Sequence, residues 1–505
     1  MVAKIFSVSM VGLQPFLITV EVEAARGLPK FEIIGLAQGG IQESKNRVLS
    51  ALKNSGHKLG PKKITVNLAP AYLRKEGTSL DLPIALGVAQ AMDLVKPAAL
   101  EQTLAVGELS LDGNLKKIHG AILIAQYAKK MGFTKVVLPW ENAEEAVYIS
   151  GVNFVFAKNV GELLAHLNGE TALPEFLRQA ILPTPTDVEE ADWSEIASQD
   201  RAKRALEIAA AGHHNVLMIG PPGVGKTFIA KRFSSLLPPL TENEMLERLN
   251  LYSLRGSELP MHSRALFRAP HHSASLAGMV GGGRPFRPGE LSLAHKGVLF
   301  LDEMVEFRRD VLELLRQPLE SGALDIVRSE GVFALPADFI FIGACNRCPC
   351  GALGDQRKEC HCSVRSIRAY WNKLSAPILD RFDMIVELTR PTWDELQDIS
   401  KRKTSEEARK EIDAARAVQK RRNHALFAGW NGKLSGKALK AVTTVAEAEQ
   451  RLLAQAMEKW GMSIRSVDKV LRVARTIADL SGEESIQLNH LTEALQYRHM
   501  PQMHG

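Results

Sequence analysis

The residues best suited to chemistry lie in a glycine-rich segment near the middle of the chain. Residues 220–227 fit the pattern G-x-x-x-x-G-K-[ST], after an apolar run and before a helical segment. Glycines let backbone N–H groups face phosphates, and the helix N-terminus favours negative charge. A chance glycine-rich turn is the alternative, which this context disfavours. The segment consists of Gly220, Pro221, Pro222, Gly223, Val224, Gly225, Lys226 and Thr227.

Two carboxylates at the end of a later apolar strand suit the same nucleotide. Residues 298–301 are Val-Leu-Phe-Leu, typical of a buried parallel strand, and Asp302 and Glu303 follow directly. Lys226 is expected to pair with the β- and γ-phosphates, and Thr227 and Asp302 to bind Mg²⁺. Glu303 is expected to activate the attacking water as general base. These residues predict an ATPase that uses ATP and Mg²⁺.

Three further side chains are candidates for contact with the γ-phosphate. Asn346 ends a third strand and is expected to orient the lytic water; a turn-forming Asn is the alternative. Arg381 is expected to reach the nucleotide of a neighbouring subunit as an arginine finger, or else to pair with Asp380 or Asp383. Arg465 begins an amphipathic helix and is expected to contact nucleotide from a helical lid, or to form an exposed ion pair.

The cysteines form a cluster: all five lie between residues 345 and 362. Cys348 and Cys350 make one C-x-C pair, and Cys360 and Cys362 make a second. Such clustering in a long chain favours a metal site over a disulfide framework. Four thiolates brought together by a loop would suit a tetrahedral Zn²⁺. Spacing by one residue is less usual than by two, so reduced cysteines without metal are the alternative.

Basic and aromatic side chains are interleaved in residues 266–296, between the glycine-rich segment and the Asp-Glu pair. This combination on a glycine-containing loop suits phosphate contact and base stacking on DNA. A structural or subunit-contact loop is the alternative, and a metal at the two adjacent histidines is disfavoured because no carboxylate or cysteine lies nearby. The candidates are Arg268, His271, His272, Arg284 and Arg287, with Phe267 and Phe286 beside them.

Composition and charge set wide limits. The 505 residues suggest about three domains, and 45% hydrophobic and 24% charged residues are ordinary for a globular chain. A net charge of +6 tolerates a polyanionic partner without demanding one. The sequence has no uninterrupted run of 18 apolar residues, so it predicts no membrane-spanning helix. The apolar stretch 5–20 is interrupted by Gln14 and Pro15, so we expect a hairpin instead of a signal peptide, and a cytoplasmic protein.

The chain divides into three blocks and a linker. The first block mixes short strands and helices, and a segment rich in Pro, Thr and acidic residues follows it. The next block alternates buried strands with helices, as in a parallel α/β domain. The last is mostly helical, with apolar residues at helical spacing from Val467 to Ala478. The expected division is 1–168, 169–192 (linker), 193–391 and 392–505.

The order of these motifs resembles the AAA+ ATPases, which assemble as hexameric rings with ATP between subunits. A closer similarity, over nearly the whole chain, is to the magnesium-chelatase-like ComM (YifB-type) family. One departure is Arg347, where the family often has Pro. The segments that carry the similarity are AKRALEIAAA at 202–211, RAPHH at 268–272, RPGELSLAH at 287–295, CPCG at 348–351 and VARTIADL at 473–480.

The resemblance implies a bacterial, cytoplasmic homo-hexamer that acts on single-stranded or branched DNA. Its best-characterised members are helicases that promote branch migration while incoming DNA recombines during natural transformation. The implied fold is α/β: a Lon-protease-like N-terminal domain, an AAA+ P-loop core and a helical lid. Residues 324–335, with Arg328 near the turn, look like the hairpin that such motors insert into their pore.

Two other functions are open to the sequence. The Lon-like block suggests an ATP-dependent protease with Ser79 as nucleophile, but the partner lysine is missing: Ile122, or Ala121, stands where it belongs. We therefore expect a non-proteolytic scaffold or DNA-contacting module. A chelatase-type ATPase that remodels a protein partner without nucleic acid is the second alternative. The N-terminal block and the cysteine insert favour the DNA motor.

Overall fold

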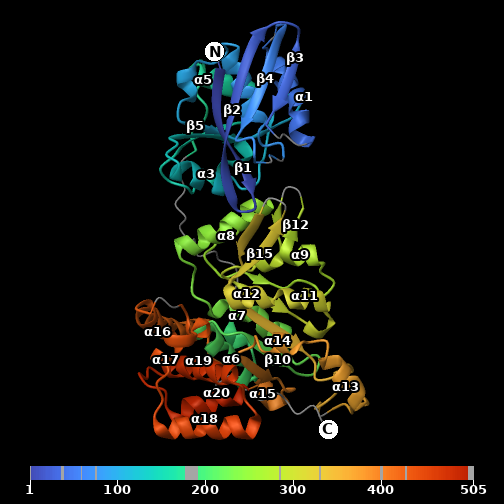
Figure 1. Cartoon of the computed structure of the whole chain (residues 1–505). Coiled ribbons are helices and arrows are strands. Elements are labelled where there is room, and N and C mark those ends of the chain that lie inside the picture. The colour runs from blue at the N-terminus through green and yellow to red at the C-terminus, as the bar shows by residue number, and fades with distance from the viewer. Residues whose placement is uncertain are drawn as a thin grey trace.

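The computed structural model describes residues 2–35, 39–57, 60–73, 75, 77–176, 192–283, 286–328, 331–355, 357–397, 402–426 and 429–498. Most of the expected linker lies outside these ranges. An N-terminal domain, a central α/β domain and a C-terminal helical region follow one another along an elongated molecule (Figure 1). No helix in the described ranges is long and apolar enough to cross a bilayer.

The N-terminal domain is built on one mixed sheet, which has seven strands in the described residues, in the order β3-β4-β2-β1-β5-β8-β9. The expected N-terminal hairpin is confirmed: β1 and β2 pair antiparallel from Val2↔Glu23 to Val11↔Gln14. The elements are β1 (Val2–Val11), β2 (Gln14–Arg26), β3 (Lys30–Ile34), α1 (Gly39–Asn54), β4 (Lys62–Ala69), α2 (Asp81–Ala91), β5 (Thr103–Ala105), β6 (Glu108–Leu109), β7 (Leu115–Lys116), α3 (Ala121–Lys130), β8 (Lys135–Pro139), α4 (Ala143–Ala146), β9 (Asn153–Ala157) and α5 (Val160–Leu167).

The central domain is built on a parallel sheet in the order β11-β14-β17-β10-β18, counting described residues. Three of its strands are buried along their whole length, as expected for strands covered on both faces. The strands are β10 (Val216–Ile219), β11 (Phe267–Arg268), β14 (Val298–Leu301), β17 (Ile340–Cys345) and β18 (Met384–Glu387). The helices are α6 (Asp200–Gly212), α7 (Lys226–Phe233), α8 (Glu242–Arg255), α9 (Leu276–Val280), α10 (Glu290–Leu293), α11 (Arg309–Leu314), α12 (Arg316–Ser321), α13 (Val364–Trp371) and α14 (Ala376–Leu379).

Two small hairpins project from this domain toward the N-terminal domain (Figure 1). One pairs β12 (Gly281–Gly282) with β13 (Arg287–Pro288). The other pairs β15 (Ala323–Arg328) with β16 (Gly331–Pro336), as the sequence predicts. The first lies within the insertion that precedes β14, and the second lies between β14 and β17.

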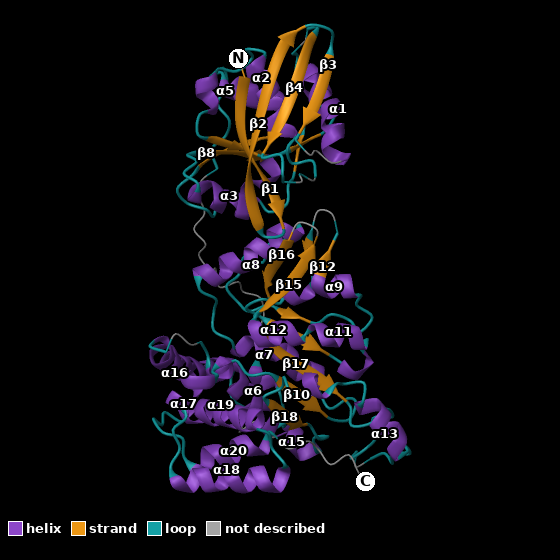
Figure 2. Ribbon diagram, viewed as in Figure 1, coloured by secondary structure: helices purple, strands orange, loops and turns teal. Residues whose placement is uncertain are grey.

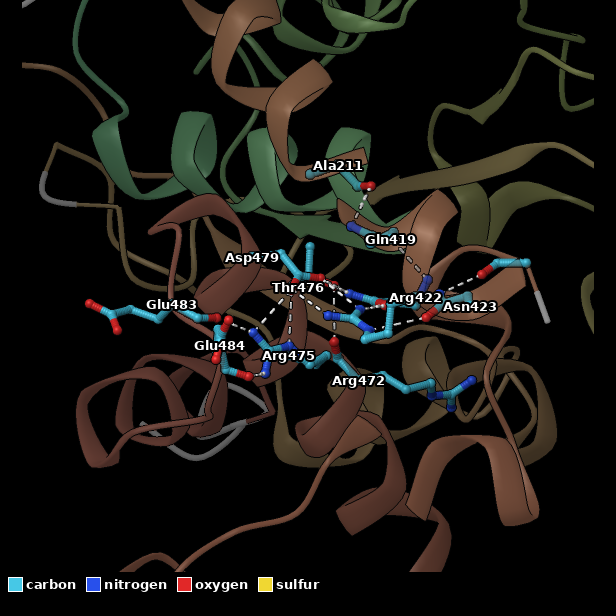
Figure 3. A network of polar contacts seen from close by, with 12 residues as sticks. Ala211, Gln419, Arg422, Asn423, Arg472, Arg475, Thr476, Asp479, Glu483 and Glu484 are labelled. Carbon is cyan, nitrogen blue, oxygen red and sulfur yellow. Dashed lines mark hydrogen bonds and ion pairs between the residues drawn. The ribbon is translucent and has the colours of Figure 1, made fainter. Parts of the chain in front are cut away.

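The C-terminal region is entirely helical in its described part (Figure 2). It packs on α6 through α16 and α19, and Gln419 Nε2 donates to the Ala211 carbonyl at 3.1 Å. Beside its apolar core, a polar network surrounds the buried Asp479 carboxylate, which Arg422 contacts at 2.7 Å and 2.9 Å (Figure 3). The helices are α15 (Trp393–Gln397), α16 (Ser405–His424), α17 (Gly436–Val442), α18 (Glu447–Trp460), α19 (Ile464–Leu480) and α20 (Leu488–Gln496).

The N-terminal domain rests on α8 and on the β15–β16 hairpin. Ile122 and Ala125 of α3 pack against Leu249 of α8. Ser253 Oγ of α8 donates to the buried Glu145 carboxylate at 2.7 Å, and burial raises the pKa of that carboxyl. Leu13, at the tip of the β1–β2 hairpin, joins an apolar cluster with residues of β15 and β16. The two domains therefore meet through apolar packing as well as hydrogen bonds.

Candidate functional site

The glycine-rich segment forms the loop between β10 and α7. Gly223 and Gly225 have φ values of +78° and +94°, which side chains other than glycine rarely adopt. Lys226 begins α7, and its Nζ donates to the carbonyls of Gly220 and Pro221 at 2.6 Å and 2.9 Å. The loop thus curls around the lysine ammonium at the N-terminus of a helix, where anions are favoured.

Side chains from the ends of two other strands meet this loop. Asn346 follows β17, and its Oδ1 accepts from Lys226 Nζ at 2.9 Å. Asp302 follows β14, and its Oδ2 accepts from the Thr227 hydroxyl at 2.5 Å. Glu303 comes next with a φ of +47°, an uncommon conformation for a residue that is not glycine. Because the strands are parallel, their carboxyl ends bring all these groups to one edge of the sheet.

The local electrostatics of this edge favour an anionic ligand. Burial lowers the pKa of Lys226, and Asp302 and Glu303 partly oppose that shift. Cys345 is the last residue of β17, next to Asn346. Burial raises the pKa of its thiol to about 12, so the thiol stays neutral. The hydroxyl of Thr227 and the carboxylate of Asp302 are oxygen donors of the kind that Mg²⁺ prefers. The residues present therefore fit a Mg²⁺–nucleotide complex.

Arg381 and Arg465 lie at the opposite edge of the same sheet. Asn215, directly before β10, donates from Nδ2 to the Arg381 carbonyl at 3.2 Å. The length of β10, roughly 13 Å at about 3.3 Å per residue, separates this edge from the glycine-rich loop. Both arginines line a cavity of 1070 Å³ between the sheet and the helical region. Arg465 thus shares a cavity with Arg381, which does not include its own subunit's Lys226.

The two arginines differ in their contacts. Arg381 Nη2 donates to Glu320 Oε2 at 2.7 Å, so its partner is neither Asp380 nor Asp383. Those two carboxylates are engaged by α19 instead: Lys469 Nζ lies 2.8 Å from Asp380, and Arg472 lies 3.6 Å from Asp383. Arg465 has no hydrogen bond or ion pair with any described residue.

The four clustered cysteines converge on one point. Their sulfur atoms lie within 4.8 Å of one another, and three Sγ–Sγ distances are 3.4 Å, 3.6 Å and 3.7 Å. A disulfide requires about 2.05 Å, whereas a tetrahedral site with Zn–S bonds of about 2.3 Å places its sulfurs about 3.8 Å apart. The N–H of Ala352 donates to Cys350 Sγ and helps to lower the pKa of that thiol to about 7. The arrangement fits four thiolate ligands of Zn²⁺.

The cysteine loop also touches the glycine-rich loop, a contact that the sequence does not predict. A Cβ added at Gly351 would lie 2.7 Å from Pro222 Cδ. Arg390 bridges the same two loops: it pairs with Asp355 at 2.9 Å and donates to the Pro222 carbonyl at 3.3 Å. The sequence offers only one indication of this contact, Gly351 directly after Cys350, and a glycine there is equally typical of a turn.

The candidate DNA-contacting residues differ in how far their side chains are exposed. The Arg268 guanidinium is held by both oxygens of Glu290, and Phe267 stacks on Phe300 with ring centroids 5.5 Å apart. Phe286 is 8% exposed. Contrary to expectation, Phe286 is buried, and the partly buried Phe267 packs against the core of the central domain. His271, His272 and Arg287 are at least partly exposed, whereas Arg284 and the side chain of Arg328 lie outside the described residues.

In the described part of the N-terminal domain, neither the expected position nor Lys75 offers a catalytic lysine to Ser79. Ala121 and Ile122 are fully buried at the start of α3. Lys75 lies four residues before Ser79 in the sequence, but its Nζ is held by carbonyls, including those of Gly35 at 2.9 Å and Leu68 at 2.8 Å. An amine that donates to several carbonyls is not free to accept the proton of a serine.

A P-loop after β10, an Asp-Glu pair at the end of β14 and a parallel sheet define a P-loop ATPase core. Family models described as "Magnesium chelatase, subunit ChlI", "Subunit ChlI of Mg-chelatase" and "Magnesium chelatase, subunit ChlI C-terminal" match residues 192–396, 20–142 and 402–498. ATP and Mg²⁺ are the cofactors that this class implies.

Whole-chain relatives narrow the class. The chain is 41% identical to the Competence protein ComM of Haemophilus influenzae over 99% of its own length and 97% of that protein. It is also 41% identical to the protein YifB of Salmonella typhimurium, over 95% and 94% of the two chains. The Magnesium-chelatase 38 kDa subunit of Cereibacter sphaeroides is 24% identical and covers 61% of this chain. The chain belongs to the ComM/YifB-type family of magnesium-chelatase-like AAA+ ATPases.

Proposed function

We propose that this chain is the subunit of a cytoplasmic, hexameric, ATP-driven DNA motor. Its activity would be that of a helicase that promotes branch migration while incoming DNA recombines during natural transformation. The observation that carries the proposal is the division of the ATP machinery between the two edges of one sheet. Lys226 and Glu303 stand at one edge and Arg381 at the other, so a complete site needs a neighbouring subunit.

Within one subunit, the carboxyl edge would bind ATP and activate water. The loop N–H groups and Lys226 would hold the phosphates, and Asn346 would orient the water that Glu303 deprotonates. Thr227 and Asp302 would hold Mg²⁺, which neutralises phosphate charge when bound. The contacts of Lys226 with Asn346 and of Thr227 with Asp302 support these roles.

The amino edge would serve the neighbour's nucleotide. Arg381 would act as the arginine finger and stabilise charge on the γ-phosphate. Arg465 lies in the same cavity and is free of other partners among the described residues, so it would contact the same phosphates. This role differs from a lid contact within one subunit, which the distance along β10 disfavours.

The DNA track would lie along the hairpins. His271, His272 and Arg287, which are at least partly exposed, would contact phosphates from the insertion together with Arg284, and Arg328 would do so from the β15–β16 hairpin. Arg268 is less suited, because Glu290 already neutralises it. The similarity over 99% of the chain to a protein named for competence supports DNA as the substrate.

The remaining parts would support this motor. We divide the chain at residues 168, 192 and 391, with a Lon-like, non-proteolytic domain first and the helical lid last. The cysteine loop would hold one structural Zn²⁺ through Cys348, Cys350, Cys360 and Cys362. A purified chain should then contain about one zinc per subunit by elemental analysis, and a Cys360→Ser, Cys362→Ser variant should contain none.

A chelatase-type ATPase that remodels a protein partner is the second candidate. The family model for residues 20–142 also has a chelatase description, so the N-terminal domain alone does not separate the two functions. The chelatase subunit is 24% identical and matches only 61% of this chain, whereas the competence protein is 41% identical and matches 99%, which favours the DNA motor.

The deciding experiment is ATP hydrolysis with and without single-stranded and forked DNA. We expect DNA to raise turnover several-fold. We expect Glu303→Gln to lower turnover about 100-fold or more, with nucleotide binding retained, because a general base contributes about that much. A robust ATPase that is indifferent to every DNA tried would overturn the DNA motor in favour of protein remodelling.

A further inference from the structure

Glu320 lies between the β15–β16 hairpin, which is the proposed DNA contact, and Arg381, which is the proposed arginine finger. It lies in the last turn of α12, and its carboxylate accepts from Arg381 Nη2 at 2.7 Å. The Glu320 side chain is 73% exposed, whereas that of Arg381 is 18% exposed. A phosphate binds arginine best through two parallel N–H donors, so Glu320 and a neighbour's γ-phosphate would compete for the same guanidinium.

The helix that carries Glu320 is continuous with the β15–β16 hairpin. Only Gly322 separates α12 from β15. Gln317 Nε2 of α12 donates to Asp325 Oδ2 of β15 at 2.7 Å, and Leu319 and Leu324 are buried in the same apolar cluster. A displacement of the hairpin would therefore carry the Glu320 carboxylate with it.

The free end of this hairpin is exposed, and a part farther from the tip packs against the N-terminal domain. Val327 and Val332, directly opposite each other in the register, are 77% and 63% exposed. Farther from the tip, Phe333 lies against Gly12 of the β1–β2 hairpin, where an added Cβ would be 3.4 Å from the ring. Force applied at the tip would reach α12 through the paired strands.

We propose that Glu320 withholds Arg381 from the neighbour's ATP until movement of the β15–β16 hairpin releases it. Glu320 is then a positioning residue that makes hydrolysis depend on DNA at the hairpin. This inference rests on the proposed function, because it takes Arg381 as the arginine finger and DNA as the ligand of the hairpin.

The test is Glu320→Gln, assayed for ATP turnover with and without forked DNA. The variant keeps the shape of the side chain and removes its charge. We expect the rate without DNA to rise about two- to five-fold, the size that a partly exposed ion pair can contribute. We expect the ratio of stimulated to basal rate to fall toward one, while DNA affinity measured separately stays unchanged. The double variant Glu320→Gln, Arg381→Ala should turn over as slowly as Arg381→Ala alone.

The matched control is Glu447→Gln, which also removes a carboxylate from an exposed pair with an arginine, Arg451, but lies on α18 of the helical region. It should match the wild type in both rates. A Glu320→Gln variant that matches this control, or that loses activity at an unchanged ratio, would overturn the inference and leave the motor intact. A wild-type rate that ignores DNA would overturn both.

Discussion

At the scale of single residues, Gly351 joins the cysteine loop to the glycine-rich loop. Its φ is +77°, and a side chain there would lie against the Pro222 ring, which is part of the ATP-binding segment. Two effects would therefore oppose a larger residue: backbone strain at positive φ and displacement of a loop that binds phosphate. Displacement of the glycine-rich loop would connect the position of the cysteine loop to the binding of ATP.

Gly351→Ala should raise the KM for ATP several-fold and leave the chain folded. The strain costs about 1 kcal/mol, a small part of the stability of a large chain. The matched control is Gly461→Ala, where φ is +59° and an added Cβ meets nothing within 4 Å. Steady-state kinetics of both variants measure the difference. Equal KM values for the two would show that the cysteine loop does not position the glycine-rich loop.

At the scale of elements, Asp383 ties the core sheet to the helical region. It is 5% exposed, and its Oδ2 accepts from the Asn215 N–H at 3.1 Å. Its other contacts are Arg472 of α19 at 3.6 Å and His214 at 3.5 Å. Arg472 and His214 hold the pKa of Asp383 below its ordinary value, although burial acts in the opposite direction. The charged carboxylate therefore stabilises the fold.

Asp383→Asn should destabilise the chain by about 3 kcal/mol at pH 7, because it removes the buried carboxylate that pairs with the partly buried Arg472. A carboxyl whose pKa is lowered on folding contributes stability above its unfolded pKa, about 3.9, and loses it as the pH falls further. The difference between wild type and variant should then shrink below about pH 4. Urea midpoints between pH 7 and pH 3 measure it. A difference that is constant over this range would contradict the role of the charge.

Elements were more predictable from the sequence than contacts. Apolar runs such as 135–139 and 298–301 form strands because a local pattern is enough to specify them. The partner of Arg268 was not predictable, since Glu290 comes to it only when β11 joins the sheet. The burial of Phe286 was equally hard to predict, because it depends on how the insertion packs. Contacts between loops, such as Gly351 with Pro222, leave no local signal.

At the scale of the whole molecule, the proposed function requires that two different faces of the chain meet. One carries Lys226 and Glu303, and the other carries Arg381 and Arg465. A face that differs from the face it contacts generates a closed ring or an open filament, not a two-fold dimer. The elongated N-terminal domain sits on the hairpin side of this unit (Figure 1), so each subunit of a ring would bring it to the same rim.

Two inactive variants should therefore restore each other when mixed. Lys226→Ala lacks its own ATP site but offers an intact Arg381, and Arg381→Ala has the reverse defect. At equal amounts and random order, about a quarter of the interfaces pair an intact site with an intact finger, because each contact is heterologous. The mixture should regain roughly that share of the wild-type rate after subunit exchange, and a Lys226→Ala, Arg381→Ala double variant mixed with Arg381→Ala should regain nothing. If the first mixture stays as inactive as its components, Arg381 serves its own subunit and the divided site is wrong.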